Sequence, residues 1–147
     1  MKVVIQRSRE ASVSVNDKLV GKIDNGLVVF VGFTHDDSDK EIDYMVNKII
    51  NLRIFDDENG IMNKSLIDTG GNILSISQFT LYADSKKGNR PNYLNALGGD
   101  KAKILYDSFN AKLKESNINV ETGVFGSDMK VSLINDGPVT IILEKNI

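Results

Sequence analysis

The sequence predicts a single α+β domain, a largely antiparallel β-sheet or barrel with two helices packed on it. Short segments of alternating apolar and polar residues, separated by turns rich in Asn, Asp and Gly, fill the first and last thirds of the chain. Two longer segments place apolar residues at helical spacing. A length of 147 residues is enough for one domain with its own core, so residues 1–147 are treated as one unit.

Four strands are expected in the first third of the chain, at residues 2–8, 11–16, 18–23 and 26–33. The polar pairs Asn16-Asp17 and Asp24-Asn25 provide the turns between the last three. The fourth segment, GLVVFVGF, is an almost continuous apolar run, which is typical of a buried strand. It is far too short to span a bilayer.

Two helices are expected. Ser38 followed three residues later by Glu41 is the capping-box pattern, which predicts a helix start. Apolar residues then recur at helical spacing: Ile42, Met45, Val46, Ile49 and Ile50. Asp100 is the candidate N-cap of the second helix, whose predicted apolar face comprises Ala102, Leu105, Phe109 and Leu113.

Between the helices, the pattern predicts a long strand over residues 73–83 (ILSISQFTLYA). Residues 84–99 form the longest irregular stretch and are the best candidate for a functional loop. Further strands are expected near 120–125, 130–134 and 139–143. Residues 135–138 (Asn-Asp-Gly-Pro) are interpreted from the local pattern as a rigid turn between the last two. That interpretation gives no reason for Pro138, which removes a backbone donor directly before a strand.

Composition excludes several kinds of site. The chain has no cysteine, so it forms no disulfide, thiolate nucleophile or Cys-type zinc site. Its single histidine, His35, excludes a multi-His metal site, and a Ser-His-Asp triad would have to be built on that residue. The net charge of −2 argues against non-specific nucleic-acid binding through bulk charge. The first residues lack the features of a signal peptide, so we expect a cytoplasmic protein with no membrane or DNA partner and no metal or cofactor.

Three polar or glycine-rich stretches allow both a structural and a functional interpretation. In a regular strand, Ser77 and Phe79 would share one face and Gln78 and Thr80 the other, and buried polar groups there would need partners. A half-exposed strand would carry the same residues with no function. TGVFG at 122–126 fits a turn followed by a strand with one core aromatic. The basic cluster Lys86, Lys87 and Arg90 could contact phosphates or be merely solvated.

Taken together and in order, these stretches resemble the D-aminoacyl-tRNA deacylase family. The matching motifs are VVIQR…ASVSV near the start, KIINLRIF, SQFTLYAD at 77–84, KGNRP at 87–91, GVFG at 123–126 and NDGPVT at 135–140. They cover essentially the whole chain without a large gap. SQFT or NxGPVT alone would be weak evidence, whereas both at this separation are specific.

The resemblance implies an activity, a partner and a set of residues. Family members hydrolyse the ester that joins a D-amino acid to tRNA. They are homodimers in which each active site receives a Gly-cis-Pro dipeptide from the other subunit. Carried onto this chain, the catalytic residues are Ser77, Gln78, Phe79 and Thr80, and the substrate-binding residues are Gly137, Pro138, Asn135, Phe125 and Arg7. Arg7 matches the arginine that steadies the Gly-Pro turn.

The mechanism that we favour uses no protein nucleophile. Thr80 matches a threonine once proposed as the nucleophile, but it would need a nearby base, and His35 is the only imidazole in the chain. Backbone N–H groups near Phe79 and Thr80 would instead stabilise the oxyanion. The 2′-hydroxyl of the terminal adenosine would help to activate water or the ester. The Gly137-Pro138 turn would exclude L side chains, so that many D-amino acids are accepted and glycine is hydrolysed at some rate.

Three alternatives stay open at the level of sequence. The chain could be a non-catalytic RNA-binding module of the same fold, or a structural or interaction domain with no substrate. It could also be a sister enzyme that edits another mischarged amino acid. Release of a D-amino acid from charged tRNA would exclude the first two, and the cis or trans state of Pro138 would help to separate the third.

Overall fold

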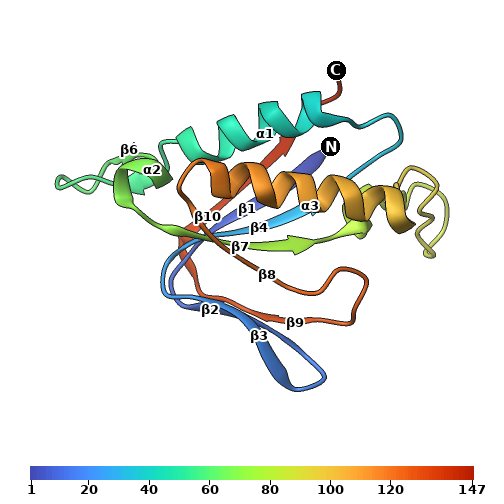
Figure 1. Cartoon of the computed structure of the whole chain (residues 1–147), viewed down its shortest axis with the longest axis horizontal. Coiled ribbons are helices and arrows are strands. Elements are labelled where there is room, and N and C mark those ends of the chain that lie inside the picture. Colours follow the sequence, from blue (N-terminus) through green and yellow to red (C-terminus); the bar gives the residue numbers. More distant parts are fainter.

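The computed structural model describes residues 1–147 and arranges them in three layers (Figure 1). Helices α1 (Asp39–Asn51) and α3 (Gly99–Glu115) cover one face of a central five-stranded sheet. A three-stranded sheet packs against part of the opposite face. The predicted α+β class is therefore confirmed, but the sheets do not close into a barrel. None of the helices is both long and apolar enough to cross a membrane.

The central sheet has the strand order β10-β1-β4-β7-β8. Its members are β1 (Lys2–Ser8), β4 (Gly26–Gly32), β7 (Asn72–Ser77), β8 (Asn119–Thr122) and β10 (Asn135–Glu144). Strand β1 runs antiparallel to both β10 and β4, whereas the β4–β7 and β7–β8 pairs are parallel. The second sheet is antiparallel and comprises β2 (Ala11–Val15), β3 (Lys18–Ile23) and β9 (Lys130–Ser132). Strands β5 (Phe55–Asp56) and β6 (Met62–Lys64) form a separate hairpin.

Strand β4 is buried on both faces, as its apolar run predicts. Leu27, Val29 and Val31 belong to the core between the sheet and the helices. Val28 belongs to a smaller core between the two sheets, where it meets Val13 of β2. Successive side chains of a strand point to opposite faces, so β4 contributes to both cores. Its position in the molecule is therefore fixed from both sides.

The predicted start of α1 is confirmed, and that of α3 is wrong. Ser38 and Glu41 form the capping box of α1, and the Glu41 carboxylate is buried. Burial raises its pKa, but hydrogen bonds from Ser38 and from the backbone outweigh this and lower the pKa to about 2. In α3, the N-cap is Gly98 and has no side-chain cap bond, while Asp100 lies in the first turn. A short third helix, α2 (Leu66–Thr69), was not predicted.

The predicted strand over 73–83 is wrong in its second half. Strand β7 ends at Ser77, and Phe79–Tyr82 form a 3-10 helix, η1. The reason lies in the neighbouring strand, because β4 ends at Gly32 and its last partner on β7 is Ser77. Beyond that point the backbone has no ladder to join, so it turns into i to i+3 hydrogen bonds.

Residues 135–138 do not form a hairpin turn. Strands β9 and β10 lie in different sheets, so they do not pair with each other. Strand β10 starts at Asn135 and pairs with β1 on both sides of the motif, through Ser8↔Asn135 and Gln6↔Thr140. Residues 136–139 therefore oppose the single residue Arg7 and protrude from the ladder as a large bulge.

Candidate active site

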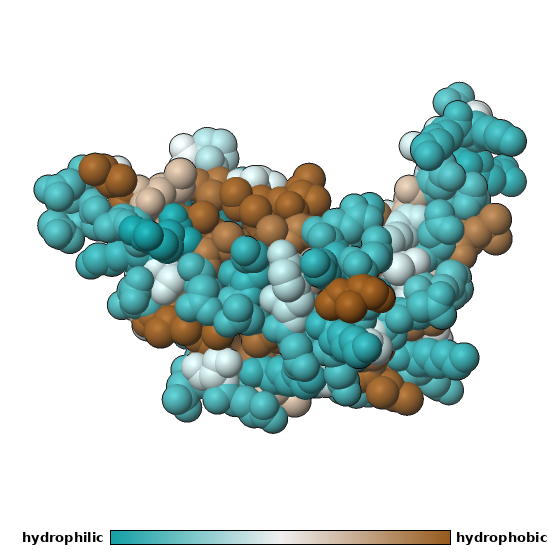
Figure 2. Space-filling model, turned by 90° about the horizontal axis from the view of Figure 1, so that it is seen from above, coloured by the Kyte–Doolittle hydropathy of each residue, from teal (hydrophilic) through white to brown (hydrophobic).

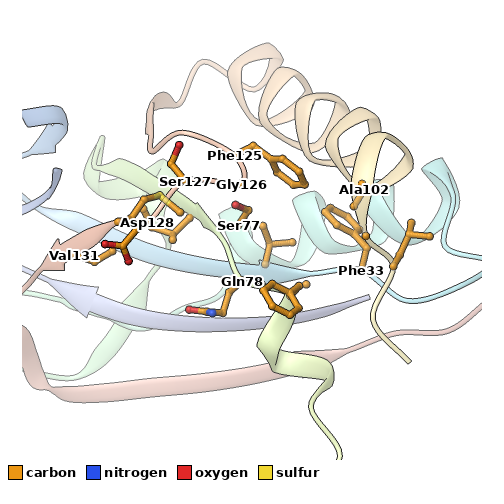
Figure 3. A pocket seen from close by; sticks show the side chains of 17 residues that line it. Phe33, Ser77, Gln78, Ala102, Phe125, Gly126, Ser127, Asp128 and Val131 are labelled. Atoms are coloured by element: carbon orange, nitrogen blue, oxygen red, sulfur yellow. The ribbon is translucent and has the colours of Figure 1, made fainter. Parts of the chain in front are cut away.

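A pocket of about 540 Å³ opens where β4 and β7 end, beneath the start of α3 (Figure 3). Three separate parts of the sequence meet in its wall. They are Ser77, Gln78 and Phe79 after β7, Phe125 and Gly126 of the GVFG motif, and residues 97–99 at the end of the long loop. Phe33 and Ala102 close one side of it (Figure 3).

The corner after β7 presents free backbone donors. The Gln78 N–H donates to the Val31 carbonyl at 2.8 Å, which is the last bond of the ladder, and the Gln78 carbonyl accepts from the Leu81 N–H. In a 3-10 helix the first N–H groups have no partner within the helix, and here these belong to Phe79 and Thr80. Two adjacent free N–H groups beside a pocket can bind an oxyanion.

Gly32 holds this corner at close range. A Cβ at position 32 would lie 2.8 Å from the Gln78 carbonyl oxygen and 3.2 Å from the Cβ of Leu81. Real Cβ atoms do not approach backbone oxygen so closely, so any larger residue would displace the corner. Its location therefore depends on a glycine in the adjacent strand.

Thr80 and His35 do not form a nucleophile and base pair. The Thr80 hydroxyl accepts a hydrogen bond from the Gln78 amide, Nε2 to Oγ1, at 2.5 Å, and Thr80 does not line the pocket. His35 Nε2 lies 2.8 Å from the Leu94 carbonyl oxygen and holds the long loop instead. No group of three or more His, Cys, Asp or Glu side chains is placed to hold a metal ion.

An aromatic pair supports the far wall. The ring of Phe125 packs against Tyr106 of α3 with 5.8 Å between centroids. The Tyr106 hydroxyl donates to the Ser75 carbonyl of β7 at 2.8 Å, and burial raises the pKa of Tyr106. Phe125 is thus fixed to both α3 and β7.

The Gly137-Pro138 bulge does not reach this pocket. Along the β1–β4 ladder, Lys2 pairs with Gly32 at the pocket, whereas Arg7 pairs with Leu27. At about 3.3 Å per residue the bulge lies roughly 16 Å along the sheet from the pocket end. The structure brings Ser77, Gln78, Phe79 and Phe125 together, but not the residues of the NDGPVT motif.

The bulge is held by its own set of contacts. The Arg7 Nε donates to the Asp136 carbonyl at 2.9 Å, and the Val139 N–H donates to the Asn135 side chain at 3.0 Å. The Gly137–Pro138 peptide bond is cis. Gly137 has φ +129°, and a Cβ there would lie 3.0 Å from Arg7 Nη2, so only glycine fits.

The basic cluster lies on a projecting loop. Figure 2 shows a hydrophilic arm on the side of the molecule where Figure 1 places residues 84–96. The arm is closed by backbone bonds between Asp84 and Asn92. Lys86, Lys87 and Arg90 are exposed and take part in none of the ion pairs of the structure.

Sequence reasoning missed part of the pocket wall. Phe33, Ala102, Ser127, Asp128 and Met129 also line it. Ser127 and Asp128 directly follow GVFG, so extending that motif along the chain would have found them. Ala102 was assigned only to a core face, because helical spacing cannot tell a core from a pocket wall.

Comparisons with known proteins match the whole chain. The model of the D-Tyr-tRNA(Tyr) deacylase family matches residues 4–144. The D-aminoacyl-tRNA deacylases of Brevibacillus brevis and Bacillus cytotoxicus are each 56% identical over 144 residues, which covers 98% of this chain and 99% of theirs.

Two solved structures share the fold. The c-Myc DNA Unwinding Element Binding Protein is 40% identical with a TM-score of 0.94, and the match covers 100% of both chains. A probable eukaryotic D-amino acid tRNA deacylase has a TM-score of 0.82, with 97% of each chain covered. At 21% identity, the second likeness supports the fold alone.

Proposed function

Because the chain belongs to the D-Tyr-tRNA(Tyr) deacylase family, we propose that it hydrolyses the ester bond of D-aminoacyl-tRNA and releases free tRNA and the D-amino acid. The observation that carries this proposal is the corner after β7, where the N–H groups of Phe79 and Thr80 are free beside a pocket. Ester hydrolysis passes through an oxyanion, and such donors stabilise it.

The pocket suits the terminal adenosine that carries the aminoacyl group. Its wall is largely apolar and includes the fixed ring of Phe125, with Ser77 and Gln78 as polar groups at one end. Bases bind aromatic and apolar walls through their faces, and a few polar groups set their orientation. A ribose held at the corner would place its 2′-hydroxyl next to the ester, where it helps to activate water or the ester itself.

A homodimer would complete the site. The bulge lies too far along the sheet to act on the pocket of its own chain, so the Gly137-Pro138 dipeptide would enter the partner's pocket. The outer face of the sheet also carries an apolar pair near its edge. Val4 and Ile142 pair across β1 and β10, belong to neither core, and Ile142 is 68% exposed. Such a patch on an edge strand favours association with a second copy.

The bulge would give the site its handedness. Gly137 lacks a Cβ, so backbone oxygens can approach the α-amino group of the substrate closely. An L-aminoacyl group anchored there would drive its side chain into the turn, whereas a D side chain would point away. Exclusion of this kind needs no contacts specific to the D side chain, so it allows many D-amino acids.

The arm would bind the tRNA phosphates, and the protein would act in the cytoplasm, where charged tRNA is used. One structural neighbour is named for binding a DNA element. For this chain, a net charge of −2 with a single cluster at Lys86, Lys87 and Arg90 favours a local contact with the RNA substrate.

The activity is tested with D-Tyr, D-Phe, D-Asp, glycyl and L-Tyr esters of tRNA. We expect all three D esters to be hydrolysed, glycine more slowly, and L-Tyr slowest by far, because only the L side chain meets the turn. Release of free amino acid is the measurement. A chain that binds tRNA but leaves every ester intact would be the non-catalytic module, and one that hydrolyses only glycyl or L esters would be the sister editing enzyme.

The mechanism is tested by removing one hydroxyl at a time. Thr80→Ala should retain measurable turnover, since the donors at the corner belong to the backbone. A substrate with a 2′-deoxy terminal adenosine should be hydrolysed by the wild type at least about tenfold more slowly, because acid–base assistance of this kind is worth about 10² or more. Isolation of an acyl-Thr80 intermediate would contradict the mechanism.

A glycine variant tests the backbone donors directly. Gly32→Ala pushes against the Gln78 carbonyl and should lower kcat sharply. Gly21→Ala is the matched control, because a Cβ at position 21 on β3 also lies 2.8 Å from a backbone carbonyl oxygen, that of Thr122, outside the pocket. Both should lower the melting temperature similarly, and overpacking of this kind costs about 1–3 kcal/mol. Equal kcat in the two variants would argue against the oxyanion site.

Mixed dimers test the composite site. A chain carrying Gly137→Ala and a chain carrying Gly32→Ala should each be impaired as homodimers. Their heterodimer should regain activity, because one of its two sites combines an intact bulge with an intact corner. Differently tagged chains allow the heterodimer to be purified and assayed. Failure of the purified heterodimer to recover would exclude the shared site.

Charge removal tests the arm. Replacing Lys86, Lys87 and Arg90 together with alanine should weaken tRNA binding and reduce the slope of log affinity against log salt by up to about 3, roughly one per phosphate contact. Lys18, Lys40 and Lys114, which are exposed and lie elsewhere, provide a control triple variant of equal charge. Equal effects of the two triple variants would mean that the arm is a solvated loop.

A further inference from the structure

Arg7 connects the bulge to residues 54–56, where the KIINLRIF motif ends and Asp56 directly follows it. Its side chain is one of the few charged groups in the interior, and the residue is only 8% exposed. The Nε donates to the Asp136 carbonyl of the bulge at 2.9 Å. On its other side, Nη1 donates to the Ile54 carbonyl at 2.9 Å and to the Asp56 carboxylate at 3.3 Å.

We propose that Asp56 is a positioning residue for the Gly137-Pro138 bulge and acts through Arg7. The proposal rests on the role given above to that bulge in excluding L-aminoacyl groups. Asp56 does not line the pocket; it holds the guanidinium of Arg7, which in turn contacts the bulge.

The guanidinium transmits position because it is rigid. Its donors form a planar fork, so fixing Nη1 at β5 also fixes the direction of Nε toward Asp136. The Nη2 edge lies against Gly137, 3.0 Å from where a Cβ would be. A shift of the fork therefore moves the backbone of the bulge.

The charges around Arg7 explain why Asp56 matters. Two carboxylates face the guanidinium from opposite sides, Asp56 at 3.3 Å from Nη1 and Asp136 at 3.9 Å from Nε. Arg9 lies 3.8 Å from the other oxygen of Asp136 and competes for it. Without Asp56, the attraction from Asp136 is no longer balanced, and the fork is drawn toward the bulge. The neutral Ile54 carbonyl, directly before β5, would be its only remaining anchor on that side.

The hairpin supplies a matched control. Glu58 lies in the turn between β5 and β6, two residues after Asp56; its side chain is 77% exposed, and its one ion pair is with Lys64 at 4.0 Å. Asp56 is 51% exposed at its side chain, so both residues can be replaced without leaving a cavity. Glu58→Ala and Asp56→Ala remove the same charge from the same element, but only the second removes a contact with Arg7.

The experiment compares the D-Tyr to L-Tyr hydrolysis ratio, in kcat/KM, for full-length Asp56→Ala, Asp56→Asn and Glu58→Ala. We expect the ratio to fall about fivefold in Asp56→Ala, the change that loss of one partly exposed ion pair gives. Asp56→Asn keeps an acceptor oxygen and should fall between Asp56→Ala and the wild type. Glu58→Ala should match the wild type, and all three should melt within a few degrees of it.

The Gly137→Ala variant distinguishes failure of the Asp56 inference from failure of the proposed role of the bulge. If it loses stereoselectivity while Asp56→Ala keeps it, the positioning role is wrong and the role of the bulge stands. If Gly137→Ala itself keeps stereoselectivity, the bulge does not determine handedness and the role of Asp56 is wrong with it. An equal loss of D-Tyr and L-Tyr hydrolysis in Asp56→Ala would also overturn the inference. The ratio would then be unchanged, which is the result expected for a residue with only a structural role.

Discussion

The end of the β4–β7 ladder is the constraint on which the site depends. The bond from the Gln78 N–H to the Val31 carbonyl is the last one that β4 can accept, because that strand stops at Gly32. The next residues must satisfy their backbone groups locally, so they form η1 and leave two N–H groups without partners. The corner thus follows from where a neighbouring strand ends, and Gly32 allows the two backbones to approach.

The antiparallel pairing of β1 with β4 separates the two halves of the site. It places the corner and the bulge at opposite ends of the same pair of strands, with Gly32 opposite Lys2 and Leu27 opposite Arg7. Two functional motifs fixed at opposite ends of a rigid sheet cannot meet within one chain. They can meet across a two-fold axis, since each copy then offers its bulge to the corner of the other. If the bulge acts on the corner, as proposed above, it must therefore come from a second copy of the chain.

The sequence predicted the elements that local rules control. The capping box of α1 and the apolar run of β4 follow from Ser38, Glu41 and a continuous apolar segment, and the structure has both. The strand over 73–83 failed at Gln78, because its end depends on β4, almost fifty residues earlier in the chain. The turn at 135–138 failed for the same kind of reason, since β10 pairs with β1 at the other end of the sequence. The local pattern of a strand does not determine which other strand it pairs with. Residues 77–80 and 135–138 were singled out by the motif resemblance and not by local patterns.

In a site whose donors are backbone groups, activity depends on residues that hold the backbone in place without touching the substrate. The chain has one histidine, held by the Leu94 carbonyl, and Thr80 has no base beside it. The proposed hydrolysis needs only oriented donors and a hydroxyl that the substrate brings. Donors of this kind cannot be improved by exchanging a side chain. Their geometry changes only through the residues that hold the backbone, such as Gly32 behind the corner and Arg7 behind the bulge. In the proposed mechanism, rate and stereoselectivity would therefore be adjusted at separate positions of the chain, because the corner and the bulge are anchored by separate contacts.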